Sequence, residues 1–194
     1  LSSDLGKQQK FVIKNGIGFF SEKVAVSGLY LAVLNGDSNT LHIFNKKSKN
    51  EPENEPINLH LNDYLVNEDT VNCVAISDDF HLCVCGTKKS SSIILVSLNK
   101  KEVERVLEID GENETPFKIT ITPSWGFIIV LSQIKKESEV NSDYRLNLFN
   151  INGYFIDKSE PFKLISSREN NENSSDSLMN YHLNRIFASR QKDV

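Results

Sequence analysis

The chain has 194 residues, of which 39% are hydrophobic, so it is long enough to bury a core and is not a disordered tail. Its 22 basic and 26 acidic residues give a net charge of −4, which argues against wrapping nucleic acid, because phosphates attract clustered Lys and Arg. No stretch reaches the ~20 apolar residues that span a bilayer, so we expect no membrane insertion, and peripheral membrane association through the full-length protein instead.

Residues 1–22 precede the clearest pattern of the chain. Phe11–Lys14 and Gly18–Phe20 are apolar and read like the end of an earlier repeat unit or an N-terminal strand. Because the sequence begins without Met, we expect it to be a piece of a longer protein.

A repeated motif dominates residues 23–165. Three segments, beginning at Val24, Val74 and Ile119, each show an apolar strand, a polar turn and a second apolar strand. Third strands are expected at 40–44, 92–96 and 145–149, and outer fourth strands at 57–61 and 103–109. The three starting residues lie 50 and 45 positions apart, close to the about 40–50 residues of a four-stranded propeller blade.

The outer strand 103–109 alternates as a half-exposed strand should. Strict alternation places Val103, Leu107 and Ile109 on one face together with Arg105, and three glutamates on the other. The charges would also discourage pairing with other chains.

The C-terminal third contains a long loop and a change of character. Residues 133–143 form a charged insertion that is long for a hairpin, and 162–165 read like the start of a fourth blade. Residues 166–176 lack apolar side chains and predict a flexible polar loop. Apolar residues every three or four positions predict a short amphipathic helix over 177–190.

The second repeat resembles a WD40 repeat. Gly86-Thr87 stands where such repeats carry Gly-Ser, and Ser77–Asp79 matches their Ser-Pro-Asp turn. More narrowly, the runs 119–130 and 146–156 resemble the WD40 propeller that ends BEACH-domain proteins, which are large scaffolds of vesicle and membrane traffic. The BEACH domain itself is absent from these residues.

The departures from the WD40 pattern concern its buried polar network. The Trp-Asp position reads Phe44-Asn45, Val96-Ser97 and Phe149-Asn150, and no Gly-His pair precedes an inner strand. The Asp-His-Ser-Trp network of a regular blade therefore cannot form. We expect apolar packing to hold the blades instead, with Phe44 and Phe149 in the core and Trp125 packed under a neighbouring blade.

The chemistry-bearing residues do not form a recognisable catalytic, cofactor or metal motif. The four histidines, His42, His60, His81 and His182, lie in or beside strands or on the expected helix, and no Gly-x-Ser-x-Gly elbow occurs. Cys83 and Cys85 share one strand face but lack a second ligand pair, and Asn15–Gly18 lacks a third glycine for a phosphate loop. The acidic pairs Glu68-Asp69 and Asp78-Asp79 are expected to be solvated turn residues.

Three basic pairs occur roughly once per blade, at Lys88-Lys89, Lys100-Lys101 and Lys135-Lys136. On one face they would engage an acidic peptide or anionic lipid; otherwise they keep the loops soluble. The residues expected to bind protein are loop residues: Asp37, Lys88, Lys89, Lys135 and Lys136.

We therefore expect an all-β, WD40-like β-propeller segment of about three to four four-stranded antiparallel blades, followed by a short helix. Its expected role is a non-catalytic, cytoplasmic scaffold for other proteins or peptides, without cofactor or nucleic acid. Two alternatives stay open: a hydrolase on a β-propeller, with His, Asp or Glu on the inner strands, and a β-barrel or β-sandwich with a small-ligand cavity.

Overall fold

The computed structural model describes residues 23–35, 38–45, 56–111, 113–135 and 142–164. The chain divides into two compact units, residues 1–161 and 162–194, and the strands described here all belong to the first unit. The segments 1–22, 166–176 and 177–190 lie outside the described residues, so the expected short helix stays a prediction.

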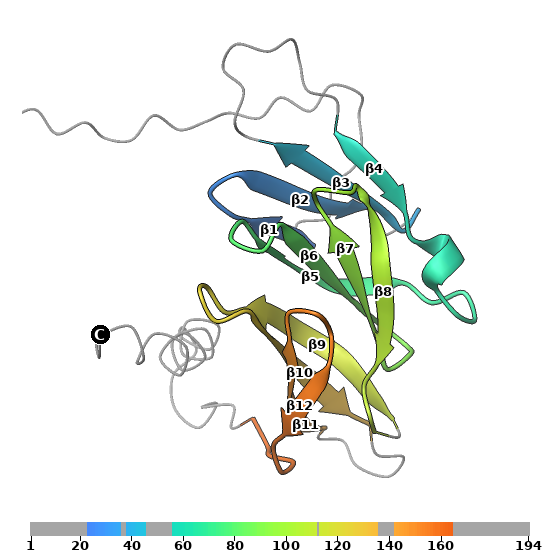
Figure 1. Ribbon diagram of the computed structural model, residues 1–194. Helices are drawn as coiled ribbons and strands as arrows, with labels where there is room; N and C mark the ends of the chain where they lie inside the picture. The colour runs from blue at the N-terminus through green and yellow to red at the C-terminus, as the bar shows by residue number, and fades with distance from the viewer. Residues whose placement is uncertain (1–22, 36–37, 46–55, 112, 136–141, 165–194) are drawn as a thin grey trace, which may run out of the picture. The chain divides into compact units, whose positions relative to one another are not determined.

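Three four-stranded antiparallel sheets follow one another along the chain, each with its strands hydrogen-bonded in sequence order (Figure 1). The first holds β1 (Val24–Val26), β2 (Tyr30–Asn35), β3 (Thr40–Asn45) and β4 (Ile57–His60). The second holds β5 (Val71–Ser77), β6 (Leu82–Thr87), β7 (Ser92–Ser97) and β8 (Glu102–Glu108). The third holds β9 (Glu114–Ile121), β10 (Phe127–Ile134), β11 (Asp143–Asn150) and β12 (Phe155–Lys158). Val24, Val74 and Ile119 lie in the first strands of successive sheets, so the predicted repeat is confirmed.

The second sheet is covered on both faces, which explains why β6 and β7 are buried throughout. Alternate residues of these strands enter two different clusters. Cys83 and Cys85 pack with the first sheet, whereas Leu82 and Val84 pack with Ile128 and other residues of the third. A strand buried on both faces reads as a continuous apolar run, as Leu82–Cys85 does.

Phe149 and Phe44 have different surroundings. Phe149 is 2% exposed in the cluster between the second and third sheets, as predicted. Phe44 is half-buried, because it pairs with Leu31 on the face of the first sheet opposite to Ile43, and Ile43 packs toward the second sheet.

The outer strand β8 does not alternate strictly, so the prediction of one shared face is wrong. A bulge between Leu95 and Val96 shifts the pairing of β7 with β8. Val103 then packs against the cluster of the first and second sheets, while Leu107 and Ile109 pack against the cluster of the second and third. An extra residue on one strand reverses the faces on either side of it, which sequence alternation cannot reveal.

Buried polar side chains join the sheets in addition to apolar packing. Asn39 donates to the carbonyl of Asp69 at 3.2 Å and accepts from the backbone N–H of Val71 at 3.3 Å, which links the first sheet to the second. Glu114, at the start of the third sheet, is 1% exposed and pairs with Arg145 within that sheet. The expectation that apolar packing alone holds the blades is therefore wrong, because other polar residues replace the missing network.

Candidate interaction surfaces

The antiparallel order of the strands gives the sheets two ends. We call one the connector end; its described residues include 38–39, 61–70, 88–91, 109–111, 113, 135 and 142. The other is the hairpin end, made by the turns 27–29, 78–81, 98–101, 122–126 and 151–154. Neighbouring sheets contact each other at equivalent ends. At the hairpin end the N–H of Leu29 in the first sheet donates to Asp78 in the second at 2.9 Å, and at the connector end Ser91 donates to the carbonyl of Glu114 in the third sheet.

The three basic pairs are divided between the two ends, and the described lysines predicted to bind protein, Lys88, Lys89 and Lys135, lie at one of them. Lys88 and Lys89 lie exposed in the β6–β7 loop, and Lys135 follows β10, all at the connector end. Lys100 and Lys101 lie in the β7–β8 turn at the hairpin end. The three pairs therefore do not share one face. Asp37 and Lys136 lie outside the described residues.

The loop that carries Lys88 and Lys89 is held by the carboxylate of Asp69. Its Oδ1 accepts from the backbone N–H groups of Thr70 at 2.6 Å and Lys89 at 2.9 Å. Its Oδ2 accepts from the N–H and the hydroxyl of Ser90, both at 2.7 Å. Thr87 supports the other side of the loop, since its hydroxyl lies 2.7 Å from the carbonyl of Ser90. The backbone of the loop is thus fixed while both lysines remain exposed.

Asp69 is 2% exposed, so the expectation that the Glu68-Asp69 pair is solvated is wrong for its second member. Burial alone would raise the pKa of Asp69. The hydrogen bonds from the Ser90 side chain and from the backbone N–H groups of Ser90, Thr70 and Lys89 outweigh burial, and the pKa lies below its usual value. The carboxylate is therefore charged at neutral pH, which strengthens each bond that holds the loop.

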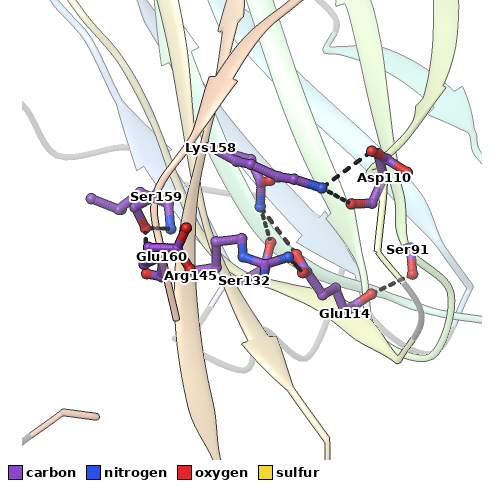
Figure 2. A network of polar contacts seen from close by, with 10 residues as sticks. Ser91, Asp110, Glu114, Ser132, Arg145, Lys158, Ser159 and Glu160 are labelled. Atoms are coloured by element: carbon purple, nitrogen blue, oxygen red, sulfur yellow. Dashed lines mark hydrogen bonds and ion pairs between the residues drawn. The ribbon is translucent and has the colours of Figure 1, made fainter. Parts of the chain in front are cut away.

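A second buried carboxylate organises the third sheet. Glu114 pairs with Arg145, accepts from Asn147 at 3.3 Å, and Asn147 also donates to Ser132 at 2.9 Å (Figure 2). Lys158 pairs with Asp110 at 3.2 Å nearby, where both side chains are partly or largely exposed (Figure 2). A network of polar groups thus ties the β8–β9 connector to the strands of the third sheet.

Asp69 and Glu114 occupy equivalent places in successive repeats. Each lies five residues before the repeat's starting residue, Val74 or Ile119. This shared spacing was the signal in the sequence for a buried acidic residue at the entry to these two sheets. Sequence reasoning missed it, because the repeats were aligned on their apolar strands alone.

Trp125 projects from the hairpin end, so the prediction that it packs under a neighbouring blade is wrong. It lies in the β9–β10 turn, as expected, but is 76% exposed. Ser124 and Gly126, on either side of it, both adopt positive φ, at 66° and 65°. These two residues make the tight reversal, and the tryptophan between them lies outside the core.

The described residues offer little for catalysis or metal binding. Among them, no group of three or more His, Cys, Asp or Glu side chains is placed to hold a metal. Burial, with a contribution from Cys85, raises the pKa of Cys73 to about 12, so its thiol stays protonated. In the part of the chain that the structure describes, no helix is long and apolar enough to cross a membrane.

Comparison with known proteins identifies the architecture and no family. No family model and no curated protein sequence matches the chain. Hsv2 of Kluyveromyces lactis has a similar structure, with a TM-score of 0.54 at 11% identity, over 79% of this chain and 48% of Hsv2. A second Hsv2 structure, described as having a complete loop 6CD, gives 0.53 at 13% identity, over 79% and 49%. Hydrazine synthase of Kuenenia stuttgartiensis gives 0.49 at 17% identity, over 73% and 37%.

The similarity to Hsv2, a propeller protein, shows the fold. The described part of the chain is all-β, with three four-stranded antiparallel sheets, and is a segment of a β-propeller. The predicted fold class is confirmed in these respects. The chain spans about half the length of the Hsv2 structures, at 48% and 49%.

Proposed function

We propose that this chain is a non-catalytic propeller module that binds an acidic segment of a protein partner at its connector end. The observation that carries the proposal is the β6–β7 loop, where buried Asp69 fixes the backbone and leaves Lys88 and Lys89 exposed. A loop that is already ordered loses less conformational entropy on binding than a free one.

The two exposed lysines of the β6–β7 loop favour an acidic segment at this loop. Lys89 donates to the carbonyl of Glu68 at 3.3 Å, which positions its ammonium at the surface of the connector end. Lys135 is exposed at the same end of the third sheet. Exposed charges of this kind mainly set association rates and specificity, so binding should weaken as salt rises.

The surroundings of the histidines and thiols support a binding role over a hydrolase. The ring nitrogens of His42 and His81 contact Asn58 and Tyr30. The ring of His60 contacts the hydroxyl of Thr40 at 3.1 Å, but among the described residues no carboxylate contacts this ring to complete a triad. The first strand β1 consists of Val24, Ala25 and Val26, where a hydrolase in a central channel would place acids or histidines.

The finer part of the proposal is a place in membrane traffic. It is supported by the resemblance of the runs 119–130 and 146–156 to the propeller of BEACH-domain proteins. Reading the complete open reading frame tests it: a BEACH domain encoded before these residues supports this context, and an unrelated domain there contradicts it.

Binding itself is tested with labelled peptides rich in Asp and Glu, each matched by a peptide with Asn and Gln in their place. Fluorescence anisotropy should show salt-dependent binding of the acidic peptides, weakened about tenfold or more by the double substitution Lys88→Glu and Lys89→Glu. Lys101→Glu, which reverses an exposed charge at the hairpin end, is the matched control and should have no effect. Equal binding of both peptide sets, or equal losses in both variants, would contradict the proposal.

A further inference from the structure

Four large apolar side chains lie exposed near the hairpin end of the third sheet. Trp125 is 76% exposed, Tyr154 59%, and Phe155 and Ile156 46% each. Trp125 comes from the β9–β10 turn and the other three from the β11–β12 turn and the strand that follows. Single exposed apolar residues are ordinary, but a group at one place marks an interaction site.

Blades of a propeller pack face against face, so further blades would cover sheet faces and leave the turns accessible. The exposure of the turn residues Trp125 and Tyr154 therefore does not depend on neighbouring blades, whereas Phe155 and Ile156 lie at the start of strand β12. The exposed Val24 and Val26, by contrast, lie within strand β1 of the first sheet. The turn residues of the third sheet are therefore the better candidates for contact with a partner.

Both turns are held rigidly. A Cβ placed on Gly126 would lie 3.0 Å from the ring of Phe80 and 3.3 Å from Cβ of Ile151, so the β9–β10 turn is clamped between two others. Thr122 closes this turn, with its N–H donating to the carbonyl of Phe127 at 2.8 Å. Trp125 is thus presented on a fixed backbone.

The second turn is fixed on β8 through Arg105. The guanidinium donates to the carbonyl of Asn152 at 3.0 Å, and its carbon lies 5.1 Å from the centre of the Tyr154 ring. Phe155 contacts Phe149 edge to face at 5.7 Å, which anchors the surface to the core. An arginine has five N–H donors, so the stacked guanidinium can still receive a carboxylate.

We propose that Arg105, Trp125, Tyr154 and Phe155 form a second interaction surface, which binds a protein segment carrying a large apolar side chain next to a carboxylate. Trp, Tyr and Arg are the residues that most often dominate binding energy at protein interfaces. A lipid surface is disfavoured, because anionic membranes attract basic clusters, whereas this end carries exposed acids and lysines side by side in the sequence, with Glu102 directly after Lys100 and Lys101. This surface is independent of the connector end.

Trp125 is the only tryptophan of the chain, so its fluorescence reports directly on the surface. A random peptide library displayed on phage is selected on the chain, and a recovered peptide is synthesised. The peptide should contain an aromatic or aliphatic residue close to Asp or Glu. It should shift Trp125 emission to shorter wavelength and protect it from acrylamide quenching.

Variants test the contribution of each group by anisotropy of the labelled peptide. Trp125→Ala and Arg105→Ala should each weaken binding at least roughly tenfold. The matched control is Tyr64→Ala, which removes a tyrosine that is 41% exposed in the short 3-10 helix η1 (Asn62–Tyr64) at the connector end. It should bind normally.

Four results would overturn the proposal. The first is that the recovered peptides lack the apolar and acidic pair, and the second is that Trp125→Ala leaves peptide binding unchanged. The third is that Tyr64→Ala weakens binding as much as Trp125→Ala does. The fourth is that vesicles of phosphatidylcholine and phosphatidylserine cause the same emission shift without peptide. Self-association of the chain that Trp125→Ala abolishes, measured by light scattering, would likewise replace the peptide by a second copy.

Discussion

Removal of the Asp69 carboxylate should loosen the β6–β7 loop at a cost that the structure allows us to estimate. The carboxylate accepts hydrogen bonds from Thr70, Lys89 and, twice, Ser90, at 2.6 to 2.9 Å. In Asp69→Ala the N–H of Lys89, an exposed residue, can turn to water, and the Ser90 hydroxyl can donate to Thr87 instead, 2.9 Å away. The N–H groups of Thr70 and Ser90 are half-buried and lose their acceptor. Two such donors at about 1–1.5 kcal/mol each predict a loss of about 2–3 kcal/mol.

The loss is measured as the free energy of unfolding in urea, followed by far-ultraviolet circular dichroism. Asp69→Asn should lose about half as much, because the amide keeps one accepting oxygen. Asp79→Asn, which changes an exposed turn carboxylate, is the control and should stay within about 0.5 kcal/mol of the parent. A wild-type stability for Asp69→Ala would refute the role of the carboxylate.

The same comparison has a defined pH dependence. The pKa of Asp69 is lower in the folded chain than in the unfolded chain, where an aspartate titrates near about 3.9. The stabilisation by the charged carboxylate is therefore complete above that value and is lost as pH falls through the folded pKa. The difference in unfolding free energy between the parent and Asp69→Asn should be constant near neutral pH and shrink below about pH 4. A constant difference across this range would contradict the lowered pKa.

Three further changes probe the core and the buried carboxylate. Gly86→Ala should lower the free energy of unfolding in urea by about 1–3 kcal/mol, because a Cβ would lie 2.6 Å from Cβ of Pro116 and 2.7 Å from Sγ of Cys73. Adding Cys73→Ala should restore part of this stability. Glu114→Gln should cost about 3 kcal/mol, since it leaves the Arg145 guanidinium without a negatively charged partner. A loss below about 1 kcal/mol would be inconsistent with the ion pair. The Cys73 thiol, with its pKa raised to about 12, should resist iodoacetamide at neutral pH until the chain is unfolded, as followed by mass spectrometry.

The strands could be predicted because the residue types that favour β-strands are also the apolar residues that these sheets bury. Branched and aromatic residues mark β6 and β7, and their uninterrupted apolar runs correspond to a sheet covered on both faces. The repeat spacing then supplied the division into sheets. The bulge between Leu95 and Val96 escaped prediction, since one extra residue changes the faces of β8 without changing its composition.

The candidate surfaces were only partly predictable. Lys88 and Lys89 were found because charged residues between two strands must lie in a loop at the surface. The exposure of the Trp125 side chain could not be predicted from its position in a turn, because a turn residue can face either the neighbouring blade or solvent. The positive φ of Ser124 and Gly126 accompanies its exposure, and Ser124 is a residue type that gives little warning of that conformation.

The buried carboxylate at the entry to the second sheet links the stability of the sheets to binding. Asp69 joins the loop of Lys89 through its side chain and the first sheet through its backbone carbonyl, which accepts from Asn39 at 3.2 Å. A change that separates the first two sheets should therefore also release the loop, although it touches neither Lys88 nor Lys89. Conversely, a partner that binds only the ordered loop must stabilise the contact between these sheets, since any ligand of the folded state opposes unfolding. Asn39→Ala should for this reason weaken acidic-peptide binding as well as stability, whereas a purely electrostatic surface would lose stability alone.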